Sequence, residues 1–372
     1  MSEVVRVLHV IGIMNRGGAE AMIMNLYRNI DRNKIQFDFV ENTFEKAAFD
    51  DEIKSLGGRI YNCPHYNGKN HFEYRKWWKE FFEEHSGEYR ILHGHLGSTA
   101  AIYLKIAKKY GLYTIAHSHN TLLQKDFESL LYKIYSFPTR YTADHFFTCS
   151  RMAGVSRFGK KIGSNEKLCT LLHNSIETDK FLYNIEVRNK VRNSLELGDN
   201  LVIGHVGRFN PQKNHEFLID IYSRIHRKNK NTILLLVGDG SQKEKIFNKV
   251  KDLSLLDSVK FLGVREDINE LMQAMDVFLF PSLYEGLPVT VIEAQAASLP
   301  CVISDCISRE CKLLDNVKFV SLDSPIEEWS DTVFDVSNLE RKNTKNEIVN
   351  SHYDIEENVR WLEDFYLEKC KK

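Results

Sequence analysis

Short runs of apolar residues recur along the whole chain, each ending near Gly, Asn or Ser and separated from the next by an amphipathic stretch of helical length. Uninterrupted apolar runs of this length are typical of parallel strands that are buried on both faces of a sheet. Strands that alternate with helices are joined by right-handed crossovers, so the pattern predicts an α/β protein with parallel sheets. The runs are Val5–Ile11, Phe37–Val40, Ile91–His95, Tyr113–His117, His145–Cys149, Lys167–His173, Leu201–Val206, Thr232–Val237, Val259–Leu262, Val277–Phe280, Pro300–Ile303 and Lys318–Val320.

The series of runs starts again near Leu201, after a polar and charged stretch over residues 183–200, where we place the linker between two domains. A chain of 372 residues is long enough for two domains, each with its own core. We therefore expect two doubly wound, Rossmann-like domains over residues 1–184 and 185–351, facing each other across a cleft, and a final helix within residues 352–372. The apolar residues of that helix recur at spacings of three, four and seven, which gives it one apolar face. From the residues alone, this face covers either its own domain or the first one.

The net charge argues against one broad class of function. Fifty basic and 51 acidic residues leave a net charge of −1, which disfavours a protein that binds nucleic acid over its whole surface. The balance hides an asymmetry, because residues 1–184 carry 25 basic and 20 acidic side chains whereas the remainder carries 25 and 31. The two halves are therefore expected to present different surfaces.

The seven cysteines form no CxxC pair and no compact disulfide framework, so we expect reduced thiols, as in a cytosolic protein. The N-terminus lacks a basic segment followed by a long apolar stretch, which argues against a signal peptide. No apolar run approaches the ~20 residues that a membrane helix requires. We expect a cytoplasmic protein that is soluble or, at most, peripheral on the inner face of the cell membrane.

Polar motifs follow two of the runs in the first half. Gly17 and Gly18 open a helix expected from about Ala19, and free backbone N–H groups at a helix start suit an anion. Their spacing departs from the GxGxxG dinucleotide fingerprint, and a paired glycine is also common in simple turns. His117 and His119 end another run; we expect them to point to opposite sides of an extended segment, which disfavours a shared metal ion. One of them would face the cleft and donate to a hydroxyl or phosphate oxygen, and a packed or solvated histidine is the alternative.

Basic residues follow the first run of the second half, in the motif GRFNPQKN over residues 207–214. Arg208 offers a planar fork of donors and Lys213 a point charge, a combination that can clamp a diphosphate, although basic loop residues are usually just solvated. The tight glycine turn at residues 237–240 is expected to be structural. Gly263, at the end of a later run, would let a flat base approach the backbone.

The densest motif is FPSLYEGLPVTVIE, over residues 280–293. A strand ends, a loop turns and a helix starts near Pro288–Val289, since proline suits the first turn of a helix. Glu285 lies on the loop and Glu293 is expected roughly two turns into the helix, so both can reach one ligand. Carboxylates accept hydrogen bonds from sugar hydroxyls, and the backbone N–H groups of Gly286–Val289 would bind phosphate. A ligand with hydroxyls at both ends and phosphates between them fits this set, which describes a nucleotide sugar.

In this order the motifs resemble those of the retaining glycosyltransferases of the GT-B fold, specifically the group 1 or family 4 type of bacterial capsule and exopolysaccharide assembly. The resemblance covers nearly the whole chain, and the pair Glu285 and Glu293 is its most specific feature. Many relatives have Phe where this chain has Leu287, a variant familiar among capsule and exopolysaccharide enzymes. The resemblance also implies a final helix that crosses back to the first domain. The matching motifs are GGAE (17–20), HSHN (117–120), HNSIETDKF (173–181), GRFNPQKN (207–214), VGDG (237–240) and FPSLYEGLPVTVIEA (280–294).

The resemblance implies a role for each donor-site residue. Arg208 and Lys213 would neutralise the donor diphosphate and the charge that develops on the leaving nucleotide. Glu293 would hold the ribose hydroxyls, and Glu285 a hydroxyl of the transferred sugar. The phosphate cradle and the base would be bound by backbone groups at Gly17, Gly18, Gly263, Gly286, Leu287, Pro288 and Val289.

The same resemblance implies transfer of a hexose or N-acetylhexosamine with retention, and without a metal, a cofactor or a stable covalent intermediate. The chain contains no Asp-x-Asp, the usual clamp for a divalent ion in the other glycosyltransferase fold. The nucleotide would be UDP, and the acceptor a growing glycan carried on a polyprenyl diphosphate. His119, with His117 as the alternative, would reach the transferred sugar beside the reacting carbon.

A basic and aromatic segment over residues 129–163 has two interpretations. It would rest on anionic lipid headgroups, at about 1 kcal/mol for each basic residue near the surface. It is equally consistent with a solvated helix face over buried aromatic side chains. The segment has one acidic residue and the basic residues Lys133, Arg140, Arg151, Arg157, Lys160 and Lys161, and its aromatic residues include Tyr132, Tyr135, Phe137, Tyr141 and Phe158.

Two other functions fit parts of the pattern. A nucleotide-sugar 2-epimerase of the non-hydrolysing kind shares the fold, but it needs acid–base residues that abstract a sugar proton, and no carboxylates beyond Glu285 and Glu293 suggest themselves. A sugar-binding module without catalysis is disfavoured because Arg208 and Lys213 accompany both carboxylates.

Overall fold

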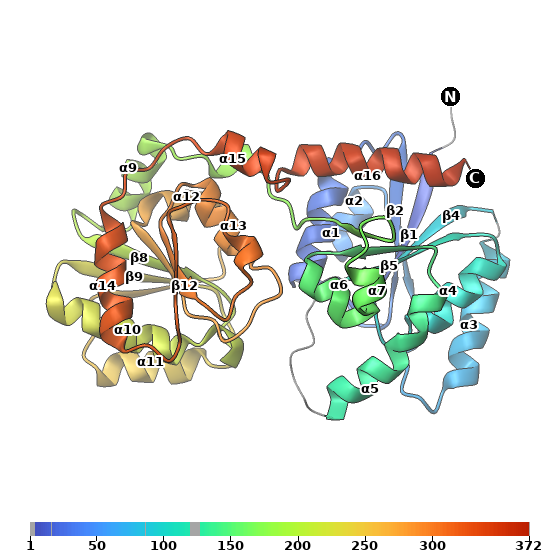
Figure 1. Cartoon of the computed structure of the whole chain (residues 1–372), viewed down its shortest axis with the longest axis horizontal. Helices are drawn as coiled ribbons and strands as arrows, with labels where there is room; N and C mark the ends of the chain where they lie inside the picture. Colours follow the sequence, from blue (N-terminus) through green and yellow to red (C-terminus); the bar gives the residue numbers. More distant parts are fainter. Residues whose placement is uncertain (1–3, 16, 86, 120–126, 372) are drawn as a thin grey trace. The chain divides into compact units, whose positions relative to one another are not determined.

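A computed structural model describes residues 4–15, 17–85, 87–119 and 127–371, without the side chains of residues 127–131. The chain divides into two units: Met1–Ser175 with Ile355–Lys372, and Ile176–Asp354. Each unit is built on one parallel sheet with helices on both faces (Figure 1). The predicted α/β architecture with two sheets is therefore confirmed.

The sheet of the first unit has seven parallel strands in the order β3-β2-β1-β4-β5-β6-β7. The apolar runs predicted every strand except β3, which has three half-buried or exposed residues and therefore no apolar signal. In register, His9 of β1 lies opposite His93 of β4. The strands are β1 Val5–Ile11, β2 Ile35–Glu41, β3 Ile60–Asn62, β4 Tyr89–Gly94, β5 Tyr113–Ser118, β6 His145–Thr148 and β7 Cys169–Leu171.

Two hydrophobic cores cover the faces of this sheet. One contains Met22 and Tyr27 of α1 together with residues of α16, and the other contains Trp78 of α3 and Tyr103 of α4. The helices of the unit are α1 Gly18–Asn29, α2 Asp50–Ser55, α3 His71–Glu84, α4 Ala100–Lys109, α5 Phe127–Ser136, the 3-10 turn η1 Phe137–Tyr141, α6 Arg151–Phe158, α7 Lys160–Gly163 and α16 Ile355–Cys370.

The last helix, α16, belongs to the first unit although it comes after the whole second unit in sequence (Figure 1). Its apolar face, with Val359, Leu362 and Tyr366, is buried in the same core as α1. Glu363 accepts a hydrogen bond of 2.7 Å from the backbone N–H of Asp31, at the end of α1. The crossing-back implied by the family resemblance is therefore confirmed, and the apolar spacing of the helix serves the first sheet.

The sheet of the second unit has six parallel strands in the order β10-β9-β8-β11-β12-β13, and the apolar runs predicted all of them. Helices cover both of its faces, as in the first unit. The strands are β8 Leu201–Val206, β9 Thr232–Val237, β10 Val259–Gly263, β11 Val277–Phe280, β12 Cys301–Ser304 and β13 Val317–Val320. The helices are α8 Thr178–Phe181, α9 Ile185–Ser194, η2 Pro211–Lys213, α10 His215–Lys228, α11 Lys243–Asp252, α12 Ile268–Ala274, α13 Val289–Ala296, η3 Arg309–Cys311, α14 Ile326–Ser337 and α15 Lys345–Asn350.

The stretch over residues 183–200, expected to be a linker, is instead a structured part of the second unit. It forms α9, whose Val191 is buried in the core of that unit. The unit already begins at Ile176, which is buried in the same core, and not at residue 185. The composition of the stretch is polar because most of α9 faces solvent and because two of its arginines make hydrogen bonds that a composition count cannot register.

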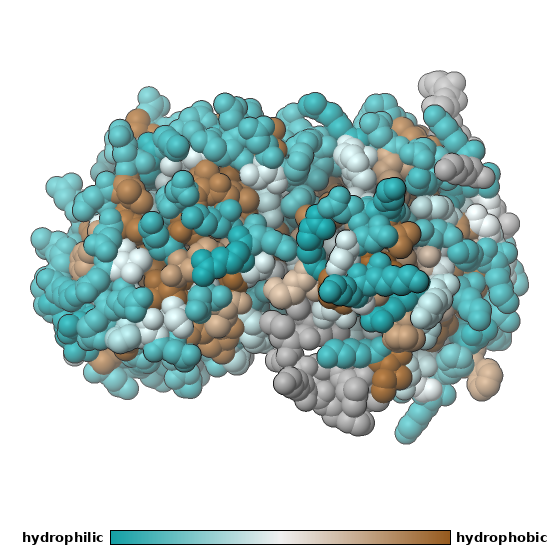
Figure 2. Space-filling model, in the orientation of Figure 1, coloured by the Kyte–Doolittle hydropathy of each residue, from teal (hydrophilic) through white to brown (hydrophobic). Residues whose placement is uncertain are grey.

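On the face shown in Figure 2, hydrophilic residues predominate and apolar patches lie between them. Among the helices that the structure describes, none is both long and apolar enough to cross a membrane.

Candidate functional site

Both sheets have a topological switch point, where the chain turns from one side of the first strand to the other. In the first unit this point lies between β1 and β4, and in the second between β8 and β11. The loops after two such strands lead away in opposite directions and leave a crevice at the carboxyl edge of the sheet, where α/β proteins bind ligands. Gly17 and Gly18 come after β1, Arg208 and Lys213 after β8, and Glu285 after β11, whereas His117 and His119 stand at the end of the neighbouring β5.

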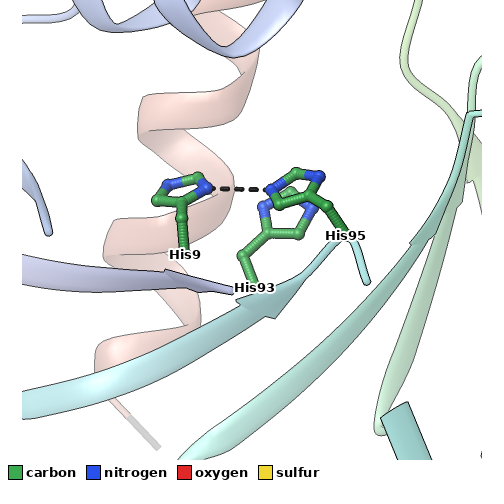
Figure 3. A group of neighbouring side chains, drawn as sticks. All are labelled: His9, His93 and His95. Atoms are coloured by element: carbon green, nitrogen blue, oxygen red, sulfur yellow. Dashed lines mark hydrogen bonds between the residues drawn. The ribbon is translucent and has the colours of Figure 1, made fainter. Parts of the chain in front are cut away.

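In the first unit, five histidines gather at the carboxyl ends of β1, β4 and β5. His9 Nδ1 lies 3.0 Å from His95 Nε2, and His95 Nδ1 lies 2.8 Å from His119 Nε2. Figure 3 shows His9, His93 and His95 at this edge. His93 Nε2 lies 3.1 Å from His117 Nδ1. The sequence singled out only His117 and His119; the signal for the others is that they too stand within or at the end of an apolar run.

The expectation that His117 and His119 point to opposite sides is wrong. Their rings stack with centroids 4.0 Å apart. The physical reason is the pleat of the strand, because side chains that are two residues apart lie on the same face. Both residues therefore join one cluster. His117 is fully buried, whereas His119 is half-buried.

Burial keeps these histidines neutral. It lowers the pKa of His9 and of His119 to about 3, and the nearby Arg157 guanidinium adds to the effect on His119. Burial, and then the neighbouring imidazoles, also lower the pKa of His93, His95 and His117. Ring nitrogens in two groups of three lie within 4.8 Å of one another, a spacing that could hold a metal ion; the groups are His9, His93 and His95, and His95, His117 and His119.

The glycine pair of the first unit stands at the start of α1, as the sequence predicts. Gly17 is the N-cap, and no side chain caps the helix. A Cβ on Gly17 would lie 2.2 Å from a carboxylate oxygen of Glu20, so this carboxylate approaches the helix start. Arg16 and Asn120 lie outside the described residues.

A cavity of about 630 Å³ lies at the carboxyl edge of the first sheet, and the sequence analysis did not predict it. Its lining mixes polar and aromatic side chains, which could pack against a sugar ring and bond to its hydroxyls. It draws on segments after several strands, so its residues are scattered over the chain and no local motif marks them. Six of them are Gly12, Asn42, Phe44, Tyr66, Leu96 and Thr99.

In the second unit, Lys213 and Glu285 meet across the switch point. Lys213 Nζ lies 2.7 Å from Glu285 Oε1, and both side chains are largely buried. Gln212 donates to Glu285 Oε2 over 3.1 Å and to the carbonyl oxygen of Tyr284. Lys213 also lies over the ring of Phe280, 4.5 Å from its centroid. The sequence assigned Lys213 and Glu285 to different parts of a ligand and gave no role to Gln212.

The glycine turn after β9 supports the loop that carries Arg208. The N–H groups of Gly207 and Phe209 donate to the carbonyl oxygens of Val237 and Asp239. A Cβ on Gly238 would lie 2.2 Å from the Gly207 oxygen, so only glycine allows this approach. These contacts account for the structural role expected of this turn. Arg208 itself is exposed on the loop.

Glu293 stands apart from other charged groups. It is the fifth residue of α13, little more than one turn from the helix start and not two. The side chain is half-buried, and burial raises its pKa to about 7. Within the described ranges, its carboxylate has no hydrogen-bonding or ion-pair partner. Such a carboxylate can gain hydrogen bonds only from a ligand or from water.

The start of α13 is open to an anion. Pro288 is its N-cap, no side chain caps the helix, and its first turn has no acidic residue. The N–H of Val289, in the first turn, lacks an acceptor within the helix. Pro288 has no N–H, so its contribution is to the helix start and not to phosphate binding. Leu287 is buried in the core, whereas Gly263 has a positive φ of 68° and open space on its Cβ side.

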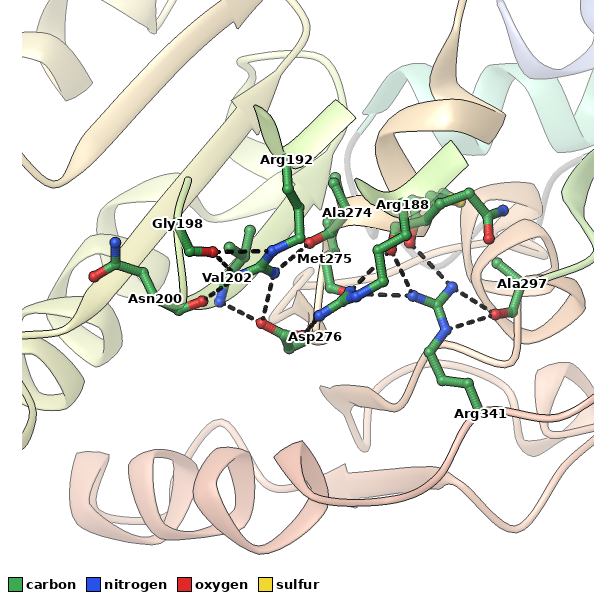
Figure 4. Close-up of polar contacts among 12 residues, drawn as sticks. Arg188, Arg192, Gly198, Asn200, Val202, Ala274, Met275, Asp276, Ala297 and Arg341 are labelled. Atoms are coloured by element: carbon green, nitrogen blue, oxygen red, sulfur yellow. Dashed lines mark hydrogen bonds and ion pairs between the residues drawn. The ribbon is translucent and has the colours of Figure 1, made fainter. Parts of the chain in front are cut away.

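Three arginines brace the strand that leads into this site (Figure 4). Arg188 and Arg192 of α9 bind the two carboxylate oxygens of Asp276, directly before β11, at 2.5 and 3.3 Å. Arg341 donates to four backbone carbonyls at the ends of α12 and α13. These bonds fix the start of β11, whose far end carries the loop with Glu285.

In the basic and aromatic segment, burial separates two groups of residues. Tyr135, Phe137 and Tyr141 are exposed, and Arg140 lies over the Phe137 ring. Phe158 and Arg157 are buried. The basic excess at the surface is therefore smaller than the sequence count, and Arg151 also pairs with Glu166.

Comparisons with known proteins agree on one family. The model of the glycosyl transferases group 1 matches residues 187–350, and that of glycosyltransferase family 4 matches residues 16–180. The putative glycosyltransferase EpsF of Bacillus subtilis is 35% identical over 370 residues, which are 97% of this chain and 96% of that protein. The UDP-Gal:α-D-GlcNAc-diphosphoundecaprenol α-1,3-galactosyltransferase of Escherichia coli is 26% identical over 297 residues, which are 76% of each chain.

Among solved structures, that of HepE from Anabaena in complex with UDP is similar in fold. It superimposes with a TM-score of 0.74 at 17% sequence identity, and the match covers 99% of this chain and 98% of that one. This likeness confirms the predicted GT-B fold.

Proposed function

The chain belongs to the group 1 glycosyltransferases, and we propose that it moves a hexose or N-acetylhexosamine from a UDP-sugar to a glycan that grows on a polyprenyl diphosphate. The transfer proceeds with retention at the anomeric carbon and without a metal ion. Its place is the assembly of a capsule, an exopolysaccharide or a related surface polysaccharide.

The observation that carries the proposal is the carboxylate of Glu293, which has no partner among the described residues. It lies at a switch point that also holds Lys213 and the uncapped start of α13. A carboxylate accepts bonds from the two ribose hydroxyls, and the first turn of α13 with Lys213 suits the diphosphate. Glu285 then meets a hydroxyl of the transferred sugar. A nucleotide sugar satisfies these groups together, whereas a free sugar would leave the cation and the helix start unused.

The choice of UDP has support from two relatives by name. HepE was solved with UDP and with UDP-glucose, and the Escherichia coli relative uses UDP-Gal. The same Escherichia coli enzyme acts on a sugar linked to diphosphoundecaprenol, which supports a lipid-linked acceptor here. We assign the acceptor sugar to the cavity beside Phe44 and Tyr66 in the first unit, because aromatic rings pack against sugar faces.

The reaction breaks the bond between the anomeric carbon and the β-phosphate oxygen and forms a bond from that carbon to an acceptor hydroxyl oxygen on the same face. Negative charge develops on the departing diphosphate, and Lys213, Arg208 and the start of α13 stabilise it. The hydroxyl proton moves to the phosphate oxygen that leaves. His119, or His117 beside it, holds a hydroxyl of the transferred sugar.

A peripheral contact with anionic membrane is part of the proposal. The exposed residues Ile134, Tyr135, Phe137 and Tyr141 lie on or next to α5, close to the basic Lys133 and Arg140. Apolar side chains among cations suit the headgroup region of a bilayer, where a polyprenyl-linked acceptor resides.

Incubation with a panel of nucleotide sugars, with and without lipid-linked acceptors, tests the function. A transferase releases UDP in an acceptor-dependent manner, and the anomeric configuration of the product, read by proton NMR, reports retention. Conversion of the donor alone into its 2-epimer would support the epimerase instead. Activity that disappears with a chelator and returns with a divalent ion would contradict metal independence.

A further inference from the structure

The returning helix α16 places a tyrosine hydroxyl against the histidines of the first sheet. Tyr366 is fully buried, and its hydroxyl lies 2.6 Å from Nδ1 of His93. His93 Nε2 in turn lies 3.1 Å from Nδ1 of His117. The three side chains form one hydrogen-bonded string from α16 through β4 to β5, although Tyr366 and His93 are 273 residues apart.

The direction of this string is set by the strengths of its donors and acceptors. In the part of the chain that the structure describes, the Tyr366 hydroxyl has His93 Nδ1 as its partner, and His117 Nε2 has none. If the hydroxyl donates, His93 carries its proton on Nε2 and donates to His117, whose own proton is then on Nε2. This direction leaves the His117 N–H and a lone pair of the tyrosine oxygen unmet.

The reverse direction also leaves one hydrogen and one lone pair unmet, but different ones. His117 would then donate from Nδ1 to His93, and His93 would donate to the tyrosine oxygen. The tyrosine hydrogen and the lone pair on His117 Nε2 would both lack a partner in the interior. A phenol hydroxyl is a stronger donor than a neutral imidazole N–H, and an imidazole nitrogen is a stronger acceptor than a phenol oxygen. The first direction is therefore favoured, because it pairs the stronger donor with the stronger acceptor and leaves only the weaker ones unmet.

His119 belongs to a second string, which leaves its tautomer open. This string runs from His9 through His95 to His119, over 3.0 and 2.8 Å. Its end atoms, His9 Nε2 and His119 Nδ1, are buried without a partner among the described residues. Both directions leave one N–H and one lone pair unmet, so the protein sets no preference here. Of the two stacked imidazoles, only His117 is linked to a group that sets its proton.

We propose that Tyr366 is a positioning residue: through His93 it holds His117 in the Nε2–H tautomer, so that a hydrogen-bond donor is kept at the carboxyl end of β5, beside His119. A buried N–H requires an acceptor. Because His117 Nε2 is buried in the ligand-free protein, an oxygen of the bound sugar substrate supplies this acceptor once the side chains that cover the ring move aside. This step rests on the proposed function, whereas the tautomer itself does not. The returning helix thereby sets the chemistry of a site residue in addition to covering the sheet.

Nitrogen NMR of the full chain with 15N-labelled histidine reads the tautomer directly, because a ring nitrogen that carries a proton and one that does not have well-separated shifts. The expected result is a proton on Nε2 of both His93 and His117. The substitution Tyr366→Phe keeps the ring in the core and removes the donor. We expect His93 and His117 to become mixtures of tautomers in this variant.

Tyr27→Phe is the matched control. Tyr27 is a fully buried tyrosine of the same core, and its hydroxyl donates to Gln36 and to the carbonyl oxygen of Leu56 and not to a histidine. It should lose a similar stability and keep the wild-type histidine spectrum. His93→Gln offers an amide N–H in place of Nε2–H and should preserve the His117 tautomer, whereas His93→Leu should not.

Turnover gives the second readout. Tyr366→Phe and His93→Leu should lower kcat by about tenfold with little change in the KM for the nucleotide sugar, while His93→Gln and Tyr27→Phe stay near the wild-type value. Loss of transfer from every nucleotide sugar tested would count against the proposed function, and the nitrogen spectra would still decide the tautomer.

Four results would overturn the proposal. They are a wild-type His117 that carries its proton on Nδ1, a Tyr366→Phe spectrum with unchanged tautomers, a changed tautomer with unchanged kcat, and one equivalent of zinc retained through dialysis against a chelator and lost in His93→Leu. Zinc would require lone pairs on these nitrogens, which the proposed string does not leave free.

Discussion

Lys213 Nζ and Glu285 Oε1 lie 2.7 Å apart, and this ion pair joins the loop after β8 to the loop after β11. Both side chains are largely buried, with 16% and 9% of their surface exposed. A bound diphosphate would take over the lysine as its counter-ion, and the glutamate would then be free to accept from a sugar hydroxyl. In the proposed function, the pair would therefore keep two ligand-binding groups satisfied and in place before the ligand arrives.

Removal of the lysine should affect rate and stability in different ways. In Lys213→Met, we expect kcat/KM for the nucleotide sugar to fall about 100-fold, because the charge on the leaving diphosphate loses its counter-ion. The free energy of unfolding should fall by about 2 kcal/mol, because Glu285 is left buried without its cation. Steady-state kinetics and urea denaturation measure the two effects.

The double variant Lys213→Met/Glu285→Gln separates the effect on the rate from the effect on the stability. It should regain most of the lost stability and none of the activity, since the unpaired charge is gone and the counter-ion is still missing. Lys249→Met is the matched control, because Lys249 pairs at 2.7 Å with Asp220, away from the switch point, and should change neither rate nor stability by much. A comparable loss of rate in that variant would contradict the argument.

The binding of the nucleotide sugar should weaken as the pH falls through about 7. Burial raises the pKa of Glu293 to about 7, and hydroxyls of the ligand donate to its ionised form, so protonation competes with binding. In Glu293→Gln the affinity should be lower and should lose this pH dependence. Calorimetric titration with a UDP-sugar, whose diphosphate does not titrate in this range, between pH 6 and 8.5 measures both. An unchanged pH profile in the variant would show that another group titrates.

The stability of the ligand-free protein should depend on pH in the opposite sense to ligand binding: it should rise as the pH falls through about 7. A carboxyl group whose pKa is raised in the folded state from 4.5 to about 7 costs stability once the pH exceeds the folded pKa, and this cost disappears as the pH falls to the unfolded pKa. Glu293→Gln should therefore stabilise the free protein at pH 8, by about 2 kcal/mol, and change little near pH 4.5. Urea denaturation at the two pH values checks the prediction.

The buried histidines should make the first unit sensitive to acid. A histidine whose folded pKa is lowered contributes its full stability above the unfolded pKa of about 6.5 and loses it as the pH falls toward the folded value. His9 and His119 have folded pKa values of about 3. Each should therefore lower the free energy of unfolding by about 1.4 kcal/mol for every pH unit of acidification over most of this window. Unfolding should therefore become easier from pH 6.5 downward.

The slope of the free energy of unfolding against pH, below pH 6.5, reports how many protons the chain takes up when it unfolds. His9→Gln should reduce that number by nearly one, because one buried imidazole no longer takes up a proton on unfolding. His65→Gln, at an exposed histidine of the same unit, is the control. Fluorescence-monitored urea denaturation at half-unit pH steps gives the slopes. Equal slopes for the wild type and His9→Gln would contradict the assignment of His9 as neutral in the fold.

The membrane contact should depend on lipid charge and on exposed aromatic residues. The double variant Phe137→Ser/Tyr141→Ser should reduce flotation with anionic vesicles by about tenfold, and raised salt should reduce flotation of the wild type. Phe247→Ser, at an exposed phenylalanine of the second unit, is the control. Equal flotation with neutral and anionic vesicles would contradict the electrostatic part of the proposal.

Local features of the sequence predicted much of the fold and the donor motifs. Buried parallel strands read as continuous apolar runs, so all strands but the short β3 were evident. Strands of this kind place their following loops at one edge of a sheet, which is why Lys213 and Glu285 could be assigned to one site from their positions alone. The polar segment around α9 was misread because its arginines bind Asp276 and backbone carbonyls, and composition does not reveal partners.

By itself, then, the sequence determined the succession of strands along the chain, the two sheets and the motifs at the switch points, because each depends on local periodicity and on the residues directly after a strand. Only the tertiary structure decided which side chains share a hydrogen bond. Gln212 reaches Glu285, five histidines from three strands form two strings, and Tyr366 joins one of them from a helix 273 residues away. Such contacts depend on sheet order and on the path of the returning helix, and no spacing along the chain encodes them.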